Sequence, residues 1–388
     1  MKITGVRLRP YQITLQRPIG DVNNPTGSNK VTSTAVFIDS DEALSGIAIA
    51  QGCGEIVVRM VDELLIGKDP RGVLGHWNTM MSHVFKGGNR GAVTAAIATI
   101  DTALWDLKAK INDEPLWKTL GASTRRVRAY ASGIDLPLSD TLLQEYYEGL
   151  AAKGVSAGKL KIGLDMESDM RRIGIMRDAL AKSGKTPELM VDVNEYWSPK
   201  QTIRHMHEIE QEFDITWIEE PARRWDAHGL KKVSSSIRAA VASGENLDDV
   251  NDFLPLLHHR AIDILNLGPK SSGITGMIKI ADLAYAYEVP ISLMNAAGSH
   301  TAHVAATLPN HVAMEYLGAG RDDIFVETHE IKDGWIELTD RPGIGLTFDE
   351  KKLTEFAIAQ DLGSLAWGRR HGAGLYVWGT GQNLPETE

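Results

Sequence analysis

The sequence is poor in cysteine, in positive charge and in long apolar runs. Its single cysteine, Cys53, cannot form a disulfide within the chain, and this favours a reducing, cytoplasmic compartment. The formal net charge of −10 makes nucleic acid and anionic membranes poor partners. No apolar run is long enough to cross a membrane, and the first residues alternate in polarity where a signal peptide would have an apolar core. These absences favour a cytoplasmic protein without a membrane anchor.

What is present is an ordinary globular composition, with 43% hydrophobic and 24% charged residues over 388 positions. Period-two alternation predicts strands over residues 3–16, 32–38 and 45–50, and apolar residues spaced by three or four predict a helix over residues 90–110. Residues 1–125 therefore read as an α+β domain. Residues 18–30 are rich in Gly, Pro and Asn and predict a long loop, which is either a surface connection or a mobile lid that contacts substrate.

After residue 125 the pattern changes to short β-rich runs that alternate with helical stretches. Eight strands are predicted within residues 127–133, 158–162, 189–193, 216–220, 239–244, 262–267, 290–294 and 312–317. Eight alternating units predict an α/β fold with a parallel barrel over residues 126–350. The segment 351–388 lacks this rhythm, and we expect it to pack back on the first domain.

Three acidic residues follow apolar runs at a regular spacing. Asp192, Glu219 and Glu245 are separated by 27 and 26 residues, which is the length of one βα unit. Side chains at the carboxyl ends of neighbouring barrel strands converge, and carboxylate oxygens without nearby Cys or His favour Mg²⁺. A single carboxylate at such a position is more commonly a helix cap or a salt-bridge partner, but three in successive units favour a metal site.

One unit earlier, two lysines are separated by one residue. Lys159 and Lys161 would face the same side of a strand. A neighbouring ammonium group and a dication both disfavour the charged form of a lysine and lower its pKa, so that Lys161 can act as a general base on the carbon beside a carboxylate. Lys159 could tune Lys161 and bind the carboxylate. Taken in isolation, the pair would more commonly be two solvated surface lysines.

Together these motifs resemble the enolase superfamily, mandelate racemase subgroup. The residues that carry the resemblance, in this order and spacing, are Lys159-Leu160-Lys161, Asp192-Val193-Asn194, Trp217-Ile218-Glu219-Glu220-Pro221, Gly244-Glu245-Asn246 and the helix over residues 96–108. The resemblance implies a modified (β/α)₇β TIM barrel with an N-terminal α+β capping domain. It also implies Mg²⁺ on Asp192, Glu219 and Glu245, with Lys161 as the base, a combination already recognised for this superfamily. It implies a small-molecule carboxylate substrate and a homo-oligomer, from dimer to octamer.

The sequence departs from the subgroup at a His–Asp pair that members usually carry at the ends of the seventh and sixth strands. Met294 stands at the His position, and Leu267, or Gly268 with a shift of one residue, at the Asp position. His300 follows six residues later and either begins the next helix or returns to the site on a loop. We expect substrate contacts from Asn194, Asn295 and Glu315. Glu315 matches a family position that hydrogen-bonds the substrate carboxylate, and it could alternatively form a salt bridge on the eighth strand.

A racemase needs an acid and a base on opposite faces of the reacting carbon, whereas a dehydration can proceed from one face. We therefore expect dehydration of a sugar acid to a 2-keto-3-deoxy acid, in which Lys161 removes the α-proton and Lys161 itself or a nearby acid protonates the departing hydroxyl. Lys159 and His300 are the other candidate catalytic residues, and His300 could supply the second acid–base group that an isomerase needs. The alternatives are a racemase, epimerase or cycloisomerase on the same scaffold, and a non-catalytic barrel that binds a ligand. The sequence does not define the substrate.

Overall fold

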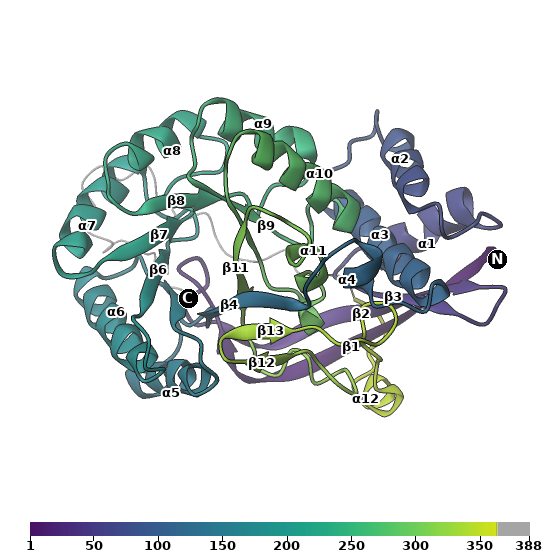
Figure 1. Cartoon of the computed structure of the whole chain (residues 1–388), viewed down its shortest axis with the longest axis horizontal. Helices are drawn as coiled ribbons and strands as arrows, with labels where there is room; N and C mark the ends of the chain where they lie inside the picture. Colours follow the sequence, from purple (N-terminus) through teal and green to yellow (C-terminus); the bar gives the residue numbers. More distant parts are fainter. Residues whose placement is uncertain (362, 364–388) are drawn as a thin grey trace.

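The N-terminal part of the computed structural model, which describes residues 1–361 and 363, is an antiparallel sheet backed by helices (Figure 1). Its strands are β1 (Ile3–Ile19), β2 (Ser28–Ser40) and β3 (Ser45–Ala50), in the order β1-β2-β3. The helices are α1 (Gly54–Met60), continued by a π-helical segment (Val61–Leu65), then α2 (Val73–His83), α3 (Ala92–Ile111) and α4 (Leu116–Thr119). Fourteen of the 20 residues of α3 are buried, because it lies between this sheet and the second domain.

The second part is a closed parallel barrel, as predicted. Its strands are β4 (Arg126–Ser132), β5 (Ala157–Lys161), β6 (Glu188–Asp192), β7 (Ile215–Glu219), β8 (Ala240–Ser243), β9 (Ile264–Leu267), β10 (Ile291–Leu293) and β11 (His311–Tyr316). They pair in sequence order, and β11 pairs with β4 to close the ring. The helices between them are α5 (Asp140–Ala151), α6 (Met166–Ala181), α7 (Pro199–Glu212), α8 (Ala227–Ser234), α9 (Val250–His258), α10 (Gly273–Ala286) and α11 (Ala302–Ala305). A 3₁₀ turn (Ala297–Ser299) precedes α11.

The interior of the barrel is a separate apolar cluster that sets which side chains reach its mouth. One member comes from nearly every strand: Tyr130, Ala157, Met190, Trp217, Ala242, Ile264 and Ala313. Successive side chains of a strand alternate between its two faces. The residues two positions further along β5, β6, β7 and β11 therefore also point inward, and these are Lys159, Asp192, Glu219 and Glu315.

Two features of the fold differ from the sequence-based expectation. The loop expected over residues 18–30 is shorter, because β1 continues to Ile19 and pairs there with Ser28 after an irregularity in register. The hairpin β12 (Glu330–Lys332) and β13 (Trp335–Glu337) was not predicted, and β13 pairs with β4 in antiparallel fashion. Asp333 and Gly334, both at positive φ, form its turn. An Asp-Gly pair between short apolar runs is a recognised hairpin signal that could have revealed it.

The two domains are joined by buried polar contacts and by the end of the described chain. Asp101 on α3 accepts hydrogen bonds from the amide (2.8 Å) and the hydroxyl (2.6 Å) of Thr275 on α10. After α12 (Glu350–Glu355), the chain returns to β1, where the amide of Ile358 donates to the carbonyl of Pro10. Residues 362 and 364–388 of the predicted C-terminal segment lie outside the described residues. In the described part of the chain, no helix has the length and apolarity to cross a membrane.

Candidate active site

The predicted base and two predicted metal ligands lie side by side on three consecutive strands. Lys161 on β5 is the register partner of Asp192 on β6, and Asp192 is the partner of Glu219 on β7. All three residues are buried, and all three terminate their strands. Parallel pairing in register thus assembles this part of the site from three segments far apart in the chain.

The two lysines form ion pairs with the carboxylates. The Nζ atom of Lys159 lies 2.5 Å from Glu219 and 3.2 Å from Glu315, and the Nζ atom of Lys161 lies 2.5 Å from Asp192. Burial opposes the charge of Lys161, but the attraction of Asp192 outweighs it and raises the pKa of the ammonium group. The lowering expected for Lys161 concerns the enzyme with a bound dication, which would compete for the Asp192 carboxylate, and it remains a prediction.

The carboxylates at the barrel mouth outnumber the lysines that could neutralise their charge. Burial, partly offset by Lys159, raises the pKa of Glu219 to about 8. Burial raises the pKa of Glu245 and of Glu220 as well. The Oε2 atom of Glu219 is buried without a hydrogen-bond partner. An excess of buried carboxylate oxygens is the donor set that Mg²⁺ prefers, so the residues present fit this ion.

The side chains themselves are not drawn together around a cation. Among the described residues, no group of three His, Cys, Asp or Glu side chains is placed to enclose a metal. The assignment of Asp192, Glu219 and Glu245 as ligands of one cation remains a prediction. Lys159 contacts both Glu219 and, at 3.5 Å, Asp192, and its ammonium group lies where these two carboxylates approach each other.

A cavity of about 560 Å³ opens above these strand ends. Of the predicted site residues, Lys161, Asn194, Glu245 and Glu315 line it. Further lining residues are 19–21, 23 and 24 of the capping domain, Gln51, Lys270 and the segment 223–225. The Nδ2 atom of Asn23 donates to the carbonyl of Asn194 at 3.0 Å, which ties the loop between β1 and β2 to the barrel mouth. This loop therefore forms part of the cavity wall.

The two remaining predicted residues are placed differently. The backbone amide of Asn295 donates to Glu315 at 3.1 Å, and its side chain does not line the cavity. His300 precedes α11 and lines a second, adjoining cavity, so the structure does not bring it to Lys161. At the positions of the missing His–Asp pair, Met294 and Leu267 are buried and apolar. Leu267 belongs to the core outside the barrel, which leaves Gly268 at the inward position of the sixth strand.

Sequence reasoning missed the residues that support the lysine strand. Asp135 accepts a hydrogen bond from the amide of Lys161 at 3.0 Å. The hydroxyl of Tyr147 lies 2.7 Å from Asp135 and 2.8 Å from the carbonyl of Lys159, so its proton is available to either acceptor. Arg172 donates to the carbonyl of Asp135 at 2.8 Å. All three side chains are buried, but no spacing relates them to Lys161, and no signal in the sequence indicated them.

Comparison with known protein families agrees with this geometry. Residues 142–352 match the model of the enolase C-terminal domain-like family. Residues 26–121 match the model of the mandelate racemase / muconate lactonizing enzyme N-terminal domain. The first match spans the barrel from α5 to α12, and the second spans most of the capping domain.

Individual relatives cover nearly the whole chain. A 3,6-anhydro-alpha-L-galactonate cycloisomerase of Streptomyces coelicolor is 32% identical over 92% of this chain and 99% of its own. An L-talarate/galactarate dehydratase of Salmonella typhimurium is 30% identical over 90% of both chains. A crystal structure of that dehydratase, liganded with Mg and L-lyxarohydroxamate, covers 92% of this chain and 93% of its own with a TM-score of 0.82 and 27% identity.

A racemase from Streptomyces coelicolor with bound magnesium covers 92% of this chain and 100% of its own, also with a TM-score of 0.82 and at 29% identity. The similar enzymes are acid-sugar dehydratases, a cycloisomerase and an epimerase, and the structural neighbours bind magnesium. The chain is therefore an enzyme of the enolase superfamily and belongs to its mandelate racemase subgroup.

Proposed function

We propose that this enzyme removes the proton next to the carboxylate of a sugar acid and expels the oxygen on the neighbouring carbon. With a free hydroxyl as the leaving group, the products are water and a 2-keto-3-deoxy acid. The observation that carries the proposal is the pair of inward positions at the ends of β9 and β10. Gly268 and Met294 there offer no acid or base, whereas Lys161 lines the cavity. Chemistry from one face suits an elimination better than a racemisation.

The residues have separable roles in this reaction. Lys161, in its neutral form, takes the α-proton, and the resulting ammonium group can return a proton to the departing β-oxygen. Lys159 forms an ion pair with Glu315 at 3.2 Å, and in the proposed reaction it binds a substrate carboxylate oxygen. Asp192, Glu219 and Glu245 would hold Mg²⁺, which when bound supplies Lewis-acid stabilisation of the enediolate. Asp135 and Tyr147 keep the backbone of β5 in place.

The cycloisomerase alternative is favoured by one comparison, the 32% identity to an enzyme of that name. In a 3,6-anhydro sugar acid the β-oxygen belongs to a ring ether. The same α-proton removal then opens the ring, no water is released, and the product is an isomer of the substrate. Dehydratase and cycloisomerase therefore use one elimination and differ in the leaving oxygen. An epimerase, in contrast, needs a second acid on the opposite face.

Turnover in deuterium oxide with Mg²⁺ distinguishes these reactions. Aldonic acids, aldaric acids and 3,6-anhydro sugar acids are incubated with the enzyme and followed by proton NMR. We expect a 2-keto-3-deoxy acid with solvent deuterium at C3. Accumulation of a C2 epimer carrying deuterium at C2, without any keto acid, would overturn the proposed elimination.

A further inference from the structure

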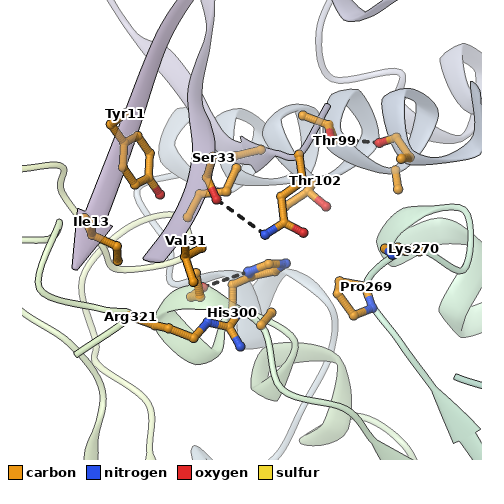
Figure 2. Close-up of a pocket in the computed structure, with 17 residues that line it drawn as sticks. Tyr11, Ile13, Val31, Ser33, Thr99, Thr102, Pro269, Lys270, His300 and Arg321 are labelled. Atoms are coloured by element: carbon orange, nitrogen blue, oxygen red, sulfur yellow. Dashed lines mark hydrogen bonds between the residues drawn. The ribbon is translucent and has the colours of Figure 1, made fainter. Parts of the chain in front are cut away.

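The cavity of about 560 Å³ above the strand ends is called the reaction cavity below. A second cavity of about 110 Å³ lies beside it, between the capping domain and the barrel. Figure 2 shows its walls: Tyr11 and Ser33 extend from the strands of the capping sheet, Thr99 and Thr102 from α3, and Pro269, Lys270, His300 and Arg321 from barrel loops. Gln51 and Lys270 line both cavities. The second cavity is thus a side chamber of the reaction cavity, and we call it the side chamber below.

The side chamber lies next to the two strand ends that lack the usual acid–base pair. Pro269 and Lys270 directly follow Gly268, and Ala296 and Ala297 follow Met294 after one residue. The side chamber therefore adds open space beside the two strand ends, where Gly268 and Met294 themselves offer no acid or base. A substrate held by its carboxylate near Lys161 can extend its far end in this direction.

The two charged side chains in the described wall of the side chamber, Arg321 and Lys270, are cationic, and Asp322, which is outside the wall, partly offsets the charge of Arg321. Arg321 is half-buried and Lys270 is exposed, and neither has an Asp or Glu within 4.0 Å among the described residues. No described Asp or Glu is part of the wall. Gln51, Ser33, Thr99 and Thr102 add neutral polar groups, and Ile13, Val31 and Ile49 add apolar surface. Cations facing a recess without carboxylates favour an anionic group as its occupant.

His300 contributes a hydrogen-bond acceptor to the side chamber. Burial lowers the pKa of its imidazole, so the ring is neutral near pH 7. Its Nδ1 atom lies 3.2 Å from the carbonyl of Ala297, and since a carbonyl can only accept, Nδ1 carries the proton. The Nε2 atom is then free of a proton and can accept a hydrogen bond from a hydroxyl group.

We propose that the side chamber binds the distal carboxylate of a diacid substrate through Arg321 and Lys270, with His300 accepting from the adjacent hydroxyl. This inference rests on the proposed function and narrows its substrate class from sugar acids to aldaric acids. A buried water needs about 10–15 Å³, so about 110 Å³ holds a carboxylate and its neighbouring carbinol group. The reaction cavity then holds the carboxylate whose α-proton is removed.

The test compares matched pairs of ligands that differ only at the distal carbon. Six-carbon aldarates and the aldonates of the same configuration are assayed for kcat/KM with Mg²⁺, and their binding is measured by calorimetry in the Lys161→Met background, which cannot turn over. We expect Arg321→Gln to lower kcat/KM and affinity for the aldarate by about tenfold to a hundredfold, as for loss of a charged hydrogen bond. The aldonate values should change less than about threefold, which also shows that the variant is folded.

Arg204→Gln on α7 removes the same charge outside both cavities and serves as the control. Lys270→Met should lower the affinity and kcat/KM for the aldarate selectively, as is expected for Arg321→Gln. Equal effects of Arg321→Gln on both ligands, no effect on either, or no binding of any aldarate overturns the inference. A stronger preference for an aldonate phosphorylated at C6 overturns the assignment to a carboxylate.

The two proposals can fail separately. Turnover that favours aldonates in the unmodified enzyme leaves the elimination standing and rejects the diacid subsite. Selective aldarate binding that depends on Arg321, without formation of a keto acid, retains the subsite and rejects the elimination.

Discussion

The residue that the proposed reaction depends on most is Lys161. Replacing it by Met keeps the length of the side chain but removes the group that takes the proton. We expect α-proton exchange and product formation to fall by about a hundredfold to ten-thousandfold, which is the usual contribution of a general base. Proton NMR in deuterium oxide measures both reactions. Lys231→Met on the exposed face of α8 is the matched control and should retain full activity. Normal exchange in Lys161→Met would assign the base to another residue.

Among the predicted metal ligands, Glu219 has a buried carboxylate oxygen that is left for a cation. Its Oε2 atom is buried without a hydrogen-bond partner, and its side chain contacts Lys159. Glu219→Gln removes the negative charge with little change of shape, so we expect the affinity for Mg²⁺ to fall at least about tenfold. Calorimetric titration with MgCl₂ measures this without relying on turnover. Glu145→Gln, exposed on α5, should leave the affinity unchanged, and an unaltered affinity in Glu219→Gln would contradict the assignment.

At the level of residues, the sequence could indicate positions but not contacts. The spacing of Lys159, Lys161, Asp192 and Glu219 correctly indicated strand ends on one side of a barrel. It could not show that Lys161 forms an ion pair with Asp192, which raises the pKa of the lysine. Which ion pairs a long flexible side chain forms depends on the local electrostatic potential, and this potential depends on all the carboxylates at the barrel mouth.

Among the elements, β5 carries the lysines, and its position depends on α5. The hydroxyl of Tyr147 on α5 is the contact to both Asp135 and the carbonyl of Lys159. Tyr147→Phe removes this hydroxyl and should lower kcat several-fold with little change in KM, because Lys161 is shifted while the binding surfaces remain. The loss of stability should be about 1 kcal/mol.

Tyr146→Phe is the matched control for the α5 prediction. The hydroxyl of this neighbouring residue donates to the carbonyl of Tyr316, at 3.1 Å, outside the lysine network. It should lose a similar amount of stability in urea denaturation and keep kcat within about twofold. A fall of kcat that is equal in both variants would mean that Tyr147 acts only through general stability.

The elements were predicted with uneven success, for physical reasons. All eight barrel strands were found, because buried parallel strands give short apolar runs at a regular interval. The end of β1 was predicted too early and the start of β2 too late, since Gly, Pro and Asn suggested a loop where Ile19 pairs with Ser28. The hairpin β12–β13 was missed because strands of three residues have too few positions for a pattern.

For the molecule as a whole, the sequence indicated the barrel and its cap but not the surface between them. That surface determines the side chamber, which is lined by residues of β1, β2, β3, α3 and three barrel loops. No interval in the sequence relates Ser33 to His300 or Arg321, because their distance depends on how the two domains pack. Specificity is therefore the property least accessible to sequence reasoning here.

The same interface predicts how stability changes with pH. His303 lies at 0% exposure between the domains, where its Nδ1 atom accepts from the amide of Trp117 (3.0 Å) and its Nε2 atom donates to the carbonyl of Ile344 (3.1 Å). A protonated imidazole cannot accept the first bond. Burial and then the nearby His329, whose ring centre is 5.3 Å away, lower the pKa of His303 well below its usual value.

Because the folded-state pKa of His303 is depressed, the unfolded chain binds more protons than the native state below about pH 6.5, and stability falls as pH decreases through this range. One such proton contributes a slope of about 1.4 kcal/mol per pH unit. Gln can replace both hydrogen bonds without titrating, so His303→Gln should flatten the slope of the unfolding free energy between pH 6.5 and 5 in urea denaturation. His228→Gln on the exposed face of α8 should not. An unchanged slope in His303→Gln would assign the pH dependence of the unfolding free energy to His329 and His300, whose imidazoles also have pKa values lowered by burial.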